Sequence, residues 1–222
     1  MLVLENLDFE KKFEYENMFY LSCDSSRIGK AISQYTLFKK TIEISGDIVE
    51  CGVFKGASLA RFAMYRKLHG LEEKKLIGFD AFGEFPKTNF SADISLREEV
   101  ILDDGGNDGI PIHQMQKVLD EKKCGKNVEL IEGDICETVP GFIKRNPDLK
   151  ISFLHLDVDL YEPSVTILEF FYPRISKGGV LVLDDYNSFH GETKAANDYF
   201  KDKDVTIHRS ELTTSPYFVI KN

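Results

Sequence analysis

The chain has 222 residues, of which 42% are hydrophobic and 29% are charged, and a formal net charge of −9. This length fits one soluble α/β domain with a sizeable core. The negative charge argues against a nucleic-acid-binding protein, which needs a basic surface to neutralise phosphates. The sequence shows no signal-peptide start and no apolar run of the roughly 18 residues that a membrane helix requires. We therefore expect a cytoplasmic protein that binds neither nucleic acid nor a membrane, with homo-oligomer formation left open.

The first segment, residues 1–45, is expected to form one or two helices that pack against the first strand. Its apolar residues recur at helical spacing from Ile28 to Ile42 and end just before Ser45-Gly46. Beyond this segment, short apolar runs alternate with helical patterns. We expect strands near residues 47–52, 75–80, 127–132, 151–157, 179–184, 204–208 and 217–221. We expect helices between them near residues 57–69, 112–123, 138–146, 163–174 and 191–202.

Strand and helix alternation with short connections predicts a doubly wound, mostly parallel sheet of seven strands. The last two strands are joined by Ser210 to Pro216, a connection too short for a crossover helix. They should therefore form a hairpin that places one antiparallel strand near the C-terminus. No repeat or linker divides the chain, so we expect a single domain over residues 1–222.

One connection is much longer than the others, between the strand ending at Asp80 and the strand near residue 127. Long loops in compact domains are often lids or binding loops. The middle of this one is polar and contains Gly105, Gly106 and Gly109. We expect residues 82–112 to form a mobile lid over a substrate.

A glycine turn joins the first strand to its helix, in Val49-Glu-Cys-Gly-Val-Phe-Lys-Gly56. Glycines let a ligand approach the backbone, and the helix N-terminus favours an anionic group such as a carboxylate. Many α/β proteins carry such turns without a ligand, so the motif alone is weak evidence. Its spacing, E-x-G-x-x-x-G, disfavours a dinucleotide.

Acids at the ends of the next two strands extend this pattern. Asp80 is placed to accept hydrogen bonds from the two hydroxyls of a ribose. Glu132-Gly-Asp134 ends the third strand and could flank an adenine ring. A glycine turn, a ribose acid and an adenine-side acid on successive strands suit a nucleoside ligand without phosphates.

Two further strands end in pairs of carboxylates, at Asp157 and Asp159 and at Asp184 and Asp185. The carboxyl ends of parallel strands lie at the edge where open α/β sheets bind ligands. Like charges so close repel unless a cation or proton lies between them, and hard divalent cations prefer oxygen ligands. The pattern therefore predicts a metal site.

Four ordered blocks resemble the macrocin O-methyltransferase family, which uses S-adenosylmethionine to methylate sugar hydroxyls. The blocks lie between about residues 24 and 202, and the last two are the most specific. They are Val49-Glu-Cys-Gly-Val-Phe-Lys-Gly56, Gly78-Phe-Asp-Ala-Phe82, His155-Leu-Asp-Val-Asp-Leu-Tyr-Glu-Pro163 and Gly178-Gly-Val-Leu-Val-Leu-Asp-Asp-Tyr186.

The resemblance implies a Rossmann-like methyltransferase with a divalent cation, usually Mg²⁺, held by Asp157, Asp184 and Asp185. It implies an acceptor that is a sugar or a sugar-containing small molecule. The lid sequence differs from that of the antibiotic-tailoring members, so the acceptor itself stays open. The residues expected to contact the cofactor are Glu50, Cys51, Gly52, Gly56, Ser58, Asp80, Ala81, Phe82, Gly133, Asp134 and Asp157.

The base that deprotonates the acceptor hydroxyl is expected to be Asp157 or Asp159, with His190 as another candidate near the same edge. Strand-end acids can also cap the next helix, so Asp159 could be structural. His155 lies inside an apolar run and is interpreted as a core histidine. A loop histidine in solvent is an alternative interpretation of His190.

Two rival functions fit the same residues. One is a metal-dependent O-methyltransferase of phenolic or catechol substrates, which the aromatic residues Phe82, Phe85 and Phe90 would suit. The other is a catalytically silent nucleotide-binding or assembly module. The complete set of strand-end acids disfavours the second rival.

Overall fold

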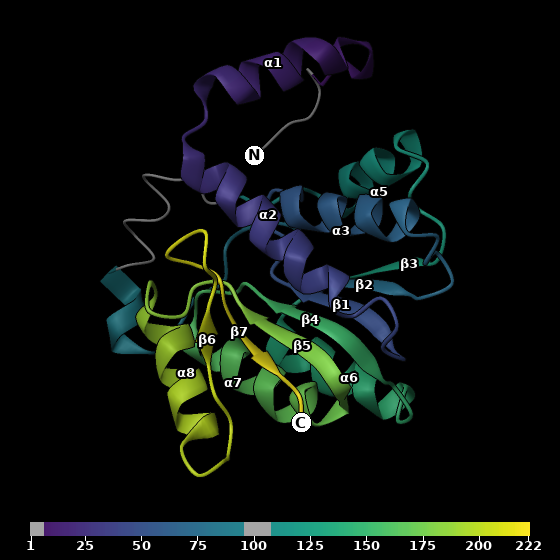
Figure 1. The fold of residues 1–222 in the computed structure, drawn as a ribbon. Coiled ribbons are helices and arrows are strands. Elements are labelled where there is room, and N and C mark those ends of the chain that lie inside the picture. Colours follow the sequence, from purple (N-terminus) through teal and green to yellow (C-terminus); the bar gives the residue numbers. More distant parts are fainter. Residues whose placement is uncertain (1–6, 96–107) are drawn as a thin grey trace.

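The computed structural model describes residues 7–95 and 108–222. Its centre is a seven-stranded sheet with the strand order β3-β2-β1-β4-β5-β7-β6 (Figure 1). The first five strands are parallel, while β7 runs antiparallel to both β5 and β6. The predicted doubly wound sheet with one antiparallel strand is confirmed. The strands are β1 (Asp47–Cys51), β2 (Leu76–Asp80), β3 (Val128–Glu132), β4 (Ile151–Leu156), β5 (Ile175–Leu183), β6 (His208–Arg209) and β7 (Tyr217–Ile220).

Helices cover both faces of the sheet, as the strand–helix alternation predicts. On one face α2, α3 and α5 pack over a core that includes Phe38, Phe62 and Phe153. On the other face α6, α7 and α8 pack over a core that includes Phe79 and Leu154. The helices are α1 (Lys12–Ser22), α2 (Ser25–Lys39), α3 (Ala57–Leu68), α5 (Ile112–Glu121), α6 (Ile135–Arg145), α7 (Tyr161–Phe170) and α8 (His190–Phe200).

The N-terminal segment forms two helices that differ in how they contact the body. Asp24 begins α2 by accepting a hydrogen bond from the Ser26 amide, and α2 buries Leu37 and Phe38 against the sheet core. In contrast, α1 buries no residue and extends away from the body (Figure 1). The prediction of one or two N-terminal helices is confirmed, and only α2 packs as expected.

One predicted strand is shifted and shortened. We expected it at residues 204–208, but β6 is the pair His208–Arg209 at the open edge of the sheet. Both of its residues are exposed, so no buried face fixes a longer pairing. Short edge strands of this kind are common because a long exposed edge invites aggregation.

The ends of β1 and β4 approach each other very closely at Gly52. A Cβ atom at this position would lie 1.7 Å from the carbonyl oxygen of Asp157, and the φ of Gly52 is +90°. Glycine is therefore required here on both steric and conformational grounds. This contact brings the glycine turn and the first strand-end acid to one place.

The base of the predicted lid is closed by backbone pairing. The Gly109 amide donates to the Gly83 carbonyl (2.7 Å), and the Ile110 amide donates to the Phe54 carbonyl (2.6 Å). The middle of the lid, with Gly105 and Gly106, lies outside the described residues. In the described part of the chain, no helix combines the length and apolar character needed to span a bilayer.

Candidate active site

A cavity of about 1080 Å³ follows the carboxyl edge of the sheet. Its wall is built from the last part of α1, from α2, the β1–α3 turn, the first lid residues, the ends of β2, β3, β4 and β5, and the start of α7. Seven residues that the sequence predicted for cofactor binding line it, whereas four others, Glu50, Cys51, Gly56 and Phe82, do not. The seven are Gly52, Ser58, Asp80, Ala81, Gly133, Asp134 and Asp157.

One end of the cavity, here called the turn end, lies at the glycine turn between β1 and α3. There the Asp80 carboxylate binds the surrounding backbone amides. One carboxylate oxygen accepts hydrogen bonds from the amides of Val53 (2.7 Å) and Phe54 (3.0 Å), and the other accepts from Phe82 (2.6 Å). A carboxylate has about four acceptor positions, so it can still accept from a ligand hydroxyl. Asp80 thus holds the glycine turn in shape while it faces the cavity.

Asp134 also has a structural role beside its place in the cavity wall. Its carboxylate begins α6 by accepting a hydrogen bond from the Cys136 amide (2.8 Å). The helix N-terminus therefore opens next to the cavity, beside Gly133. This arrangement is compatible with the predicted adenine-side position, although one carboxylate oxygen already accepts the Cys136 amide.

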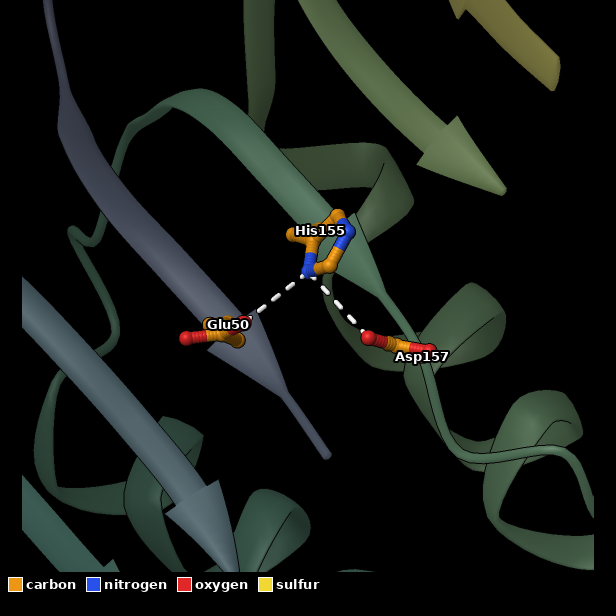
Figure 2. A group of neighbouring side chains, drawn as sticks. All are labelled: Glu50, His155 and Asp157. Carbon is orange, nitrogen blue, oxygen red and sulfur yellow. Dashed lines mark hydrogen bonds and ion pairs between the residues drawn. The ribbon is translucent and has the colours of Figure 1, made fainter. Parts of the chain in front are cut away.

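Below the cavity, a fully buried histidine lies between two carboxylates. His155 donates from Nδ1 to Glu50 (3.1 Å) and from Nε2 to Asp184 (3.2 Å). Figure 2 shows Glu50 and Asp157 on the same side of the ring, where Asp157 lies 4.0 Å from Nδ1. Glu50 is therefore a partner of His155, and its side chain does not reach the cavity where the sequence placed it.

The two carboxylates beside His155 favour its protonated form. Burial alone would lower its pKa, but the hydrogen bonds with Asp184 and Glu50 outweigh burial and raise the pKa of His155 to about 10. Burial would raise the pKa of Asp184, but the contacts with His155 and Lys30 hold it below its usual range. The interpretation of His155 as a core histidine is confirmed, because its side chain is fully buried.

The predicted metal ligands Asp157, Asp184 and Asp185, here called the acid trio, come together at the other end of the cavity. One carboxylate oxygen from each lies within 4.8 Å of the others. Burial, followed by the neighbouring acids, raises the pKa of Asp157 and of Asp185 well above the usual range. Three carboxylates in this arrangement need positive charge.

Asp159 and Glu192 add further acidity beside the acid trio. Glu192 is fully buried, accepts a hydrogen bond from the Asp185 amide (3.1 Å), and donates its own amide to the Asp159 carbonyl (3.1 Å). Burial and the charge of Asp157 raise the pKa of Asp159 to about 7. Glu192 thus fixes the loop that carries Asp185.

The donor set fits a hard divalent cation. Within the described part of the chain, Asp185 Oδ2 and Glu192 Oε2 are buried without a hydrogen-bond partner. Unpaired buried carboxylate oxygens are costly, and oxygen-rich sites are those that Mg²⁺ prefers. A second group of possible ligands, Glu50, His155 and Asp157, also contains an unpaired buried oxygen, Glu50 Oε2, but His155 Nδ1 already donates to the other Glu50 oxygen and so is not free to bind a cation.

Helix α2 contributes two polar residues that the sequence analysis missed. Lys30 forms an ion pair with Asp184, and Gln34 donates to the same carboxylate (3.4 Å) while accepting from Arg61 (2.8 Å). Lys30 and Gln34 are four residues apart and so share a helix face. The sequence did contain a signal for this contact, namely two polar side chains on one face of a helix whose apolar residues Leu37 and Phe38 pack on the sheet.

The lid residues before the undescribed stretch are attached to α7 and α8. Glu162 accepts hydrogen bonds from the Asn89 amide (2.9 Å) and the Thr88 hydroxyl (2.8 Å), and Phe90 stacks on Tyr161. Asp93 is buried and accepts from the Tyr161 amide (3.0 Å). No sequence signal indicated these contacts because they join distant parts of the chain.

His190 does not join the other predicted catalytic residues. It begins α8, is exposed, and lies outside the cavity wall. Asp157 and Asp159 both line the cavity. Of the three candidate bases, the structure brings the two aspartates to the cavity and leaves the histidine in solvent.

Comparisons with known proteins agree with this geometry. A structure described as the calicheamicin methyltransferase CalS11 superposes with a TM-score of 0.79 at 24% identity, covering 98% of this chain and 88% of that one. The O-methyltransferase NovP superposes with a TM-score of 0.73 at 18% identity, covering 88% of this chain and 80% of that one. These likenesses establish the fold.

A curated relative from Streptomyces olivaceus is 28% identical over 149 residues. It is 8-demethyl-8-(2,3-dimethoxy-alpha-L-rhamnosyl)-tetracenomycin-C 4'-O-methyltransferase, and the match covers 64% of this chain but only 54% of that protein. The family model of the macrocin O-methyltransferases (TylF) matches residues 30–215, which include both ends of the cavity. The chain belongs to the macrocin O-methyltransferase family.

Proposed function

We propose that this protein transfers a methyl group from S-adenosylmethionine to a hydroxyl of a sugar or sugar-containing small molecule, with the help of a divalent cation. The observation that carries the proposal is the acid trio, two of whose members, Asp157 and Asp185, line the same cavity as the glycine turn and Asp80. Family membership and the rhamnose-bearing substrate named for the Streptomyces relative support the choice of reaction and acceptor class.

The turn end of the cavity is proposed to bind the cofactor. Asp80 would accept from the ribose hydroxyls while its other contacts keep the turn in shape. Gly52 leaves room for the methionine part, and the N-terminus of α3 next to Ser58 favours its carboxylate. The methyl group already reacts readily on a sulfonium, so the main task of the protein is alignment.

At the other end, Asp157, Asp184 and Asp185 would hold the cation. A bound Mg²⁺ would lower the pKa of an acceptor hydroxyl. His155 and Glu192 position two of these carboxylates, because one bonds the Asp184 side chain and the other bonds the Asp185 amide. Either Asp157 or Asp159 would then accept the hydroxyl proton, since both line the cavity.

Methyl transfer from isotopically labelled S-adenosylmethionine tests the proposal. The acceptor panel should contain nucleotide sugars, rhamnosylated small molecules and, for the rival function, catechols. We expect label in the sugar compounds only when Mg²⁺ is present. Label in catechols alone would support the rival, and no transfer to any acceptor, despite cofactor binding, would favour a silent module.

A pair of variants separates the two candidate bases. Asp159→Asn removes a carboxylate outside the acid trio, so a loss of rate at saturating Mg²⁺ would identify it as the base. Asp157→Asn should both raise the required Mg²⁺ concentration and, if Asp157 is the base, leave a rate deficit at saturation. His190→Ala serves as the control and should keep the wild-type rate.

A further inference from the structure

Lys30 reaches from α2 into the acid trio and neutralises its most buried member. The ammonium pairs with Asp184 Oδ2, while Oδ1 of the same carboxylate accepts from His155 (3.2 Å) and Gln34 (3.4 Å). Lys30 therefore occupies the oxygen that Asp184 would offer to a cation.

The position of Lys30 also controls access to that oxygen. Asp184 is fully buried and does not line the cavity, whereas Lys30, Asp157 and Asp185 do. A cation that enters from the cavity and binds all three carboxylates must take the place of the ammonium on Asp184. The Lys30 side chain is 27% exposed and has a flexible stem, so it has room to turn toward the cavity.

We infer that Lys30 is a built-in, displaceable cation of the metal site, which covers Asp184 in the metal-free protein and leaves it when a divalent cation binds. The inference rests on the metal site of the proposed function. His155 and Gln34 already occupy Oδ1 of Asp184, so the ammonium and a divalent cation compete for the one remaining oxygen, Oδ2, where their positive charges repel. Metal affinity is then lowered by the competition, and the metal-free acids are kept from mutual repulsion.

Metal titration of the chelator-treated protein by calorimetry tests the inference, with no cofactor or acceptor present. Lys30→Met should bind Mg²⁺ roughly tenfold or more tightly than the wild type, because no ion pair has to be broken. Lys55→Met is the matched control. Lys55 lines the same cavity, but its ammonium contacts the Asp108 carbonyl and the Phe54 ring, so its loss should change affinity little.

Equal or weaker Mg²⁺ binding by Lys30→Met would overturn the inference, because a supporting or purely structural lysine gives that result. A tightening that Lys55→Met reproduces would also overturn it and point to general electrostatics. If Lys30→Met does not fold, Lys30→Gln keeps a polar head at the same position and should show the same direction.

A measurement on the wild type completes the test. Acetylation of Lys30, followed by mass spectrometry, should be faster with Mg²⁺ than with EDTA, because the displaced amine faces the cavity. An unchanged rate contradicts displacement. If neither the wild type nor Lys30→Met binds Mg²⁺ at millimolar concentration, the inference fails. Methyl transfer that continues in EDTA would in that case still support the proposed reaction, without the metal. Displacement of Lys30 by Mg²⁺ without methyl transfer to any acceptor would support the inference and contradict the proposed reaction.

Discussion

Asp80 and Asp185 lie at the same edge of the sheet and face the same cavity, yet their surroundings differ. Both oxygens of Asp80 accept backbone amides, so this carboxylate is satisfied when the chain folds. Asp185 has a buried oxygen without a partner in the described residues, and burial together with nearby acids raises its pKa. The turn end of the cavity is complete without a ligand, whereas the acid trio is incomplete without a cation.

This difference separates stability from binding. Substitution at the turn end should disturb the fold and cofactor binding together, because the same carboxylate serves both. At the acid trio, the effect of a substitution on stability should depend on which groups the replaced carboxylate contacts. Asp184 is balanced by Lys30 and His155, whereas Asp185 forms no ion pair with any residue in the described part of the chain.

Removal of divalent cations should give the largest effect on activity. EDTA is expected to abolish methyl transfer and added Mg²⁺ to restore it, because without the cation nothing lowers the pKa of the acceptor hydroxyl. Binding of S-adenosylhomocysteine, measured by calorimetry in the same buffer, should persist, since the turn end is already complete. Wild-type activity in excess EDTA would remove the metal from the proposed reaction.

The next largest effect concerns stability and distinguishes two neighbouring aspartates. Asp184→Asn should lower the free energy of unfolding by about 3–5 kcal/mol in the metal-free protein, because it leaves the fully buried His155 and the partly exposed Lys30 without their counter-ion. Asp185→Asn should keep or raise this free energy, since it relieves repulsion among acids. Chemical denaturation in EDTA measures both. Equal losses would contradict the assigned charge balance.

At the turn end, Asp80→Ala should weaken S-adenosylhomocysteine binding by roughly 1.5–3 kcal/mol or more, through lost ribose contacts and a relaxed turn. Asp24→Ala is the control, because it removes a carboxylate that lies outside the cavity wall and accepts a hydrogen bond from the Ser26 amide at the start of α2. It should lower stability slightly through the lost helix cap. Unchanged cofactor affinity in Asp80→Ala would refute the ribose assignment.

The sequence predicted the sheet because its signals are local. Apolar runs such as Phe153 to Leu156 and the spacing between them decide where strands lie, and the short last connection decides that β7 is antiparallel. The edge strand β6 was misplaced because exposed residues carry no such signal. The acid trio was predicted because carboxyl ends of parallel strands meet at one edge.

The partners of these acids could not be predicted in the same way. Lys30 and Glu192 act on Asp184 and Asp185 only because α2 and α8 pack beside the strand ends. Glu50 follows the family pattern, yet alternation along β1 directs it to His155 and away from the cavity. Such contacts depend on tertiary packing across distant segments, which periodicity does not encode.

The smallest expected effect concerns the lid. Glu162→Ala removes the acceptor of the Asn89 amide and the Thr88 hydroxyl, so the lid should detach locally from α7. We expect a loss of about 1 kcal/mol in unfolding free energy, and faster hydrogen exchange at Asn89 than in the wild type. Glu169→Ala, on an exposed position of the same helix, is the control and should change neither. The comparison between the cavity ends predicts that this variant retains Mg²⁺ affinity, because Glu162 lies outside the acid trio. Exchange at Asn89 equal to that of the wild type would show that the segment is held by other contacts, such as Phe90 on Tyr161 and Asp93 on the start of α7.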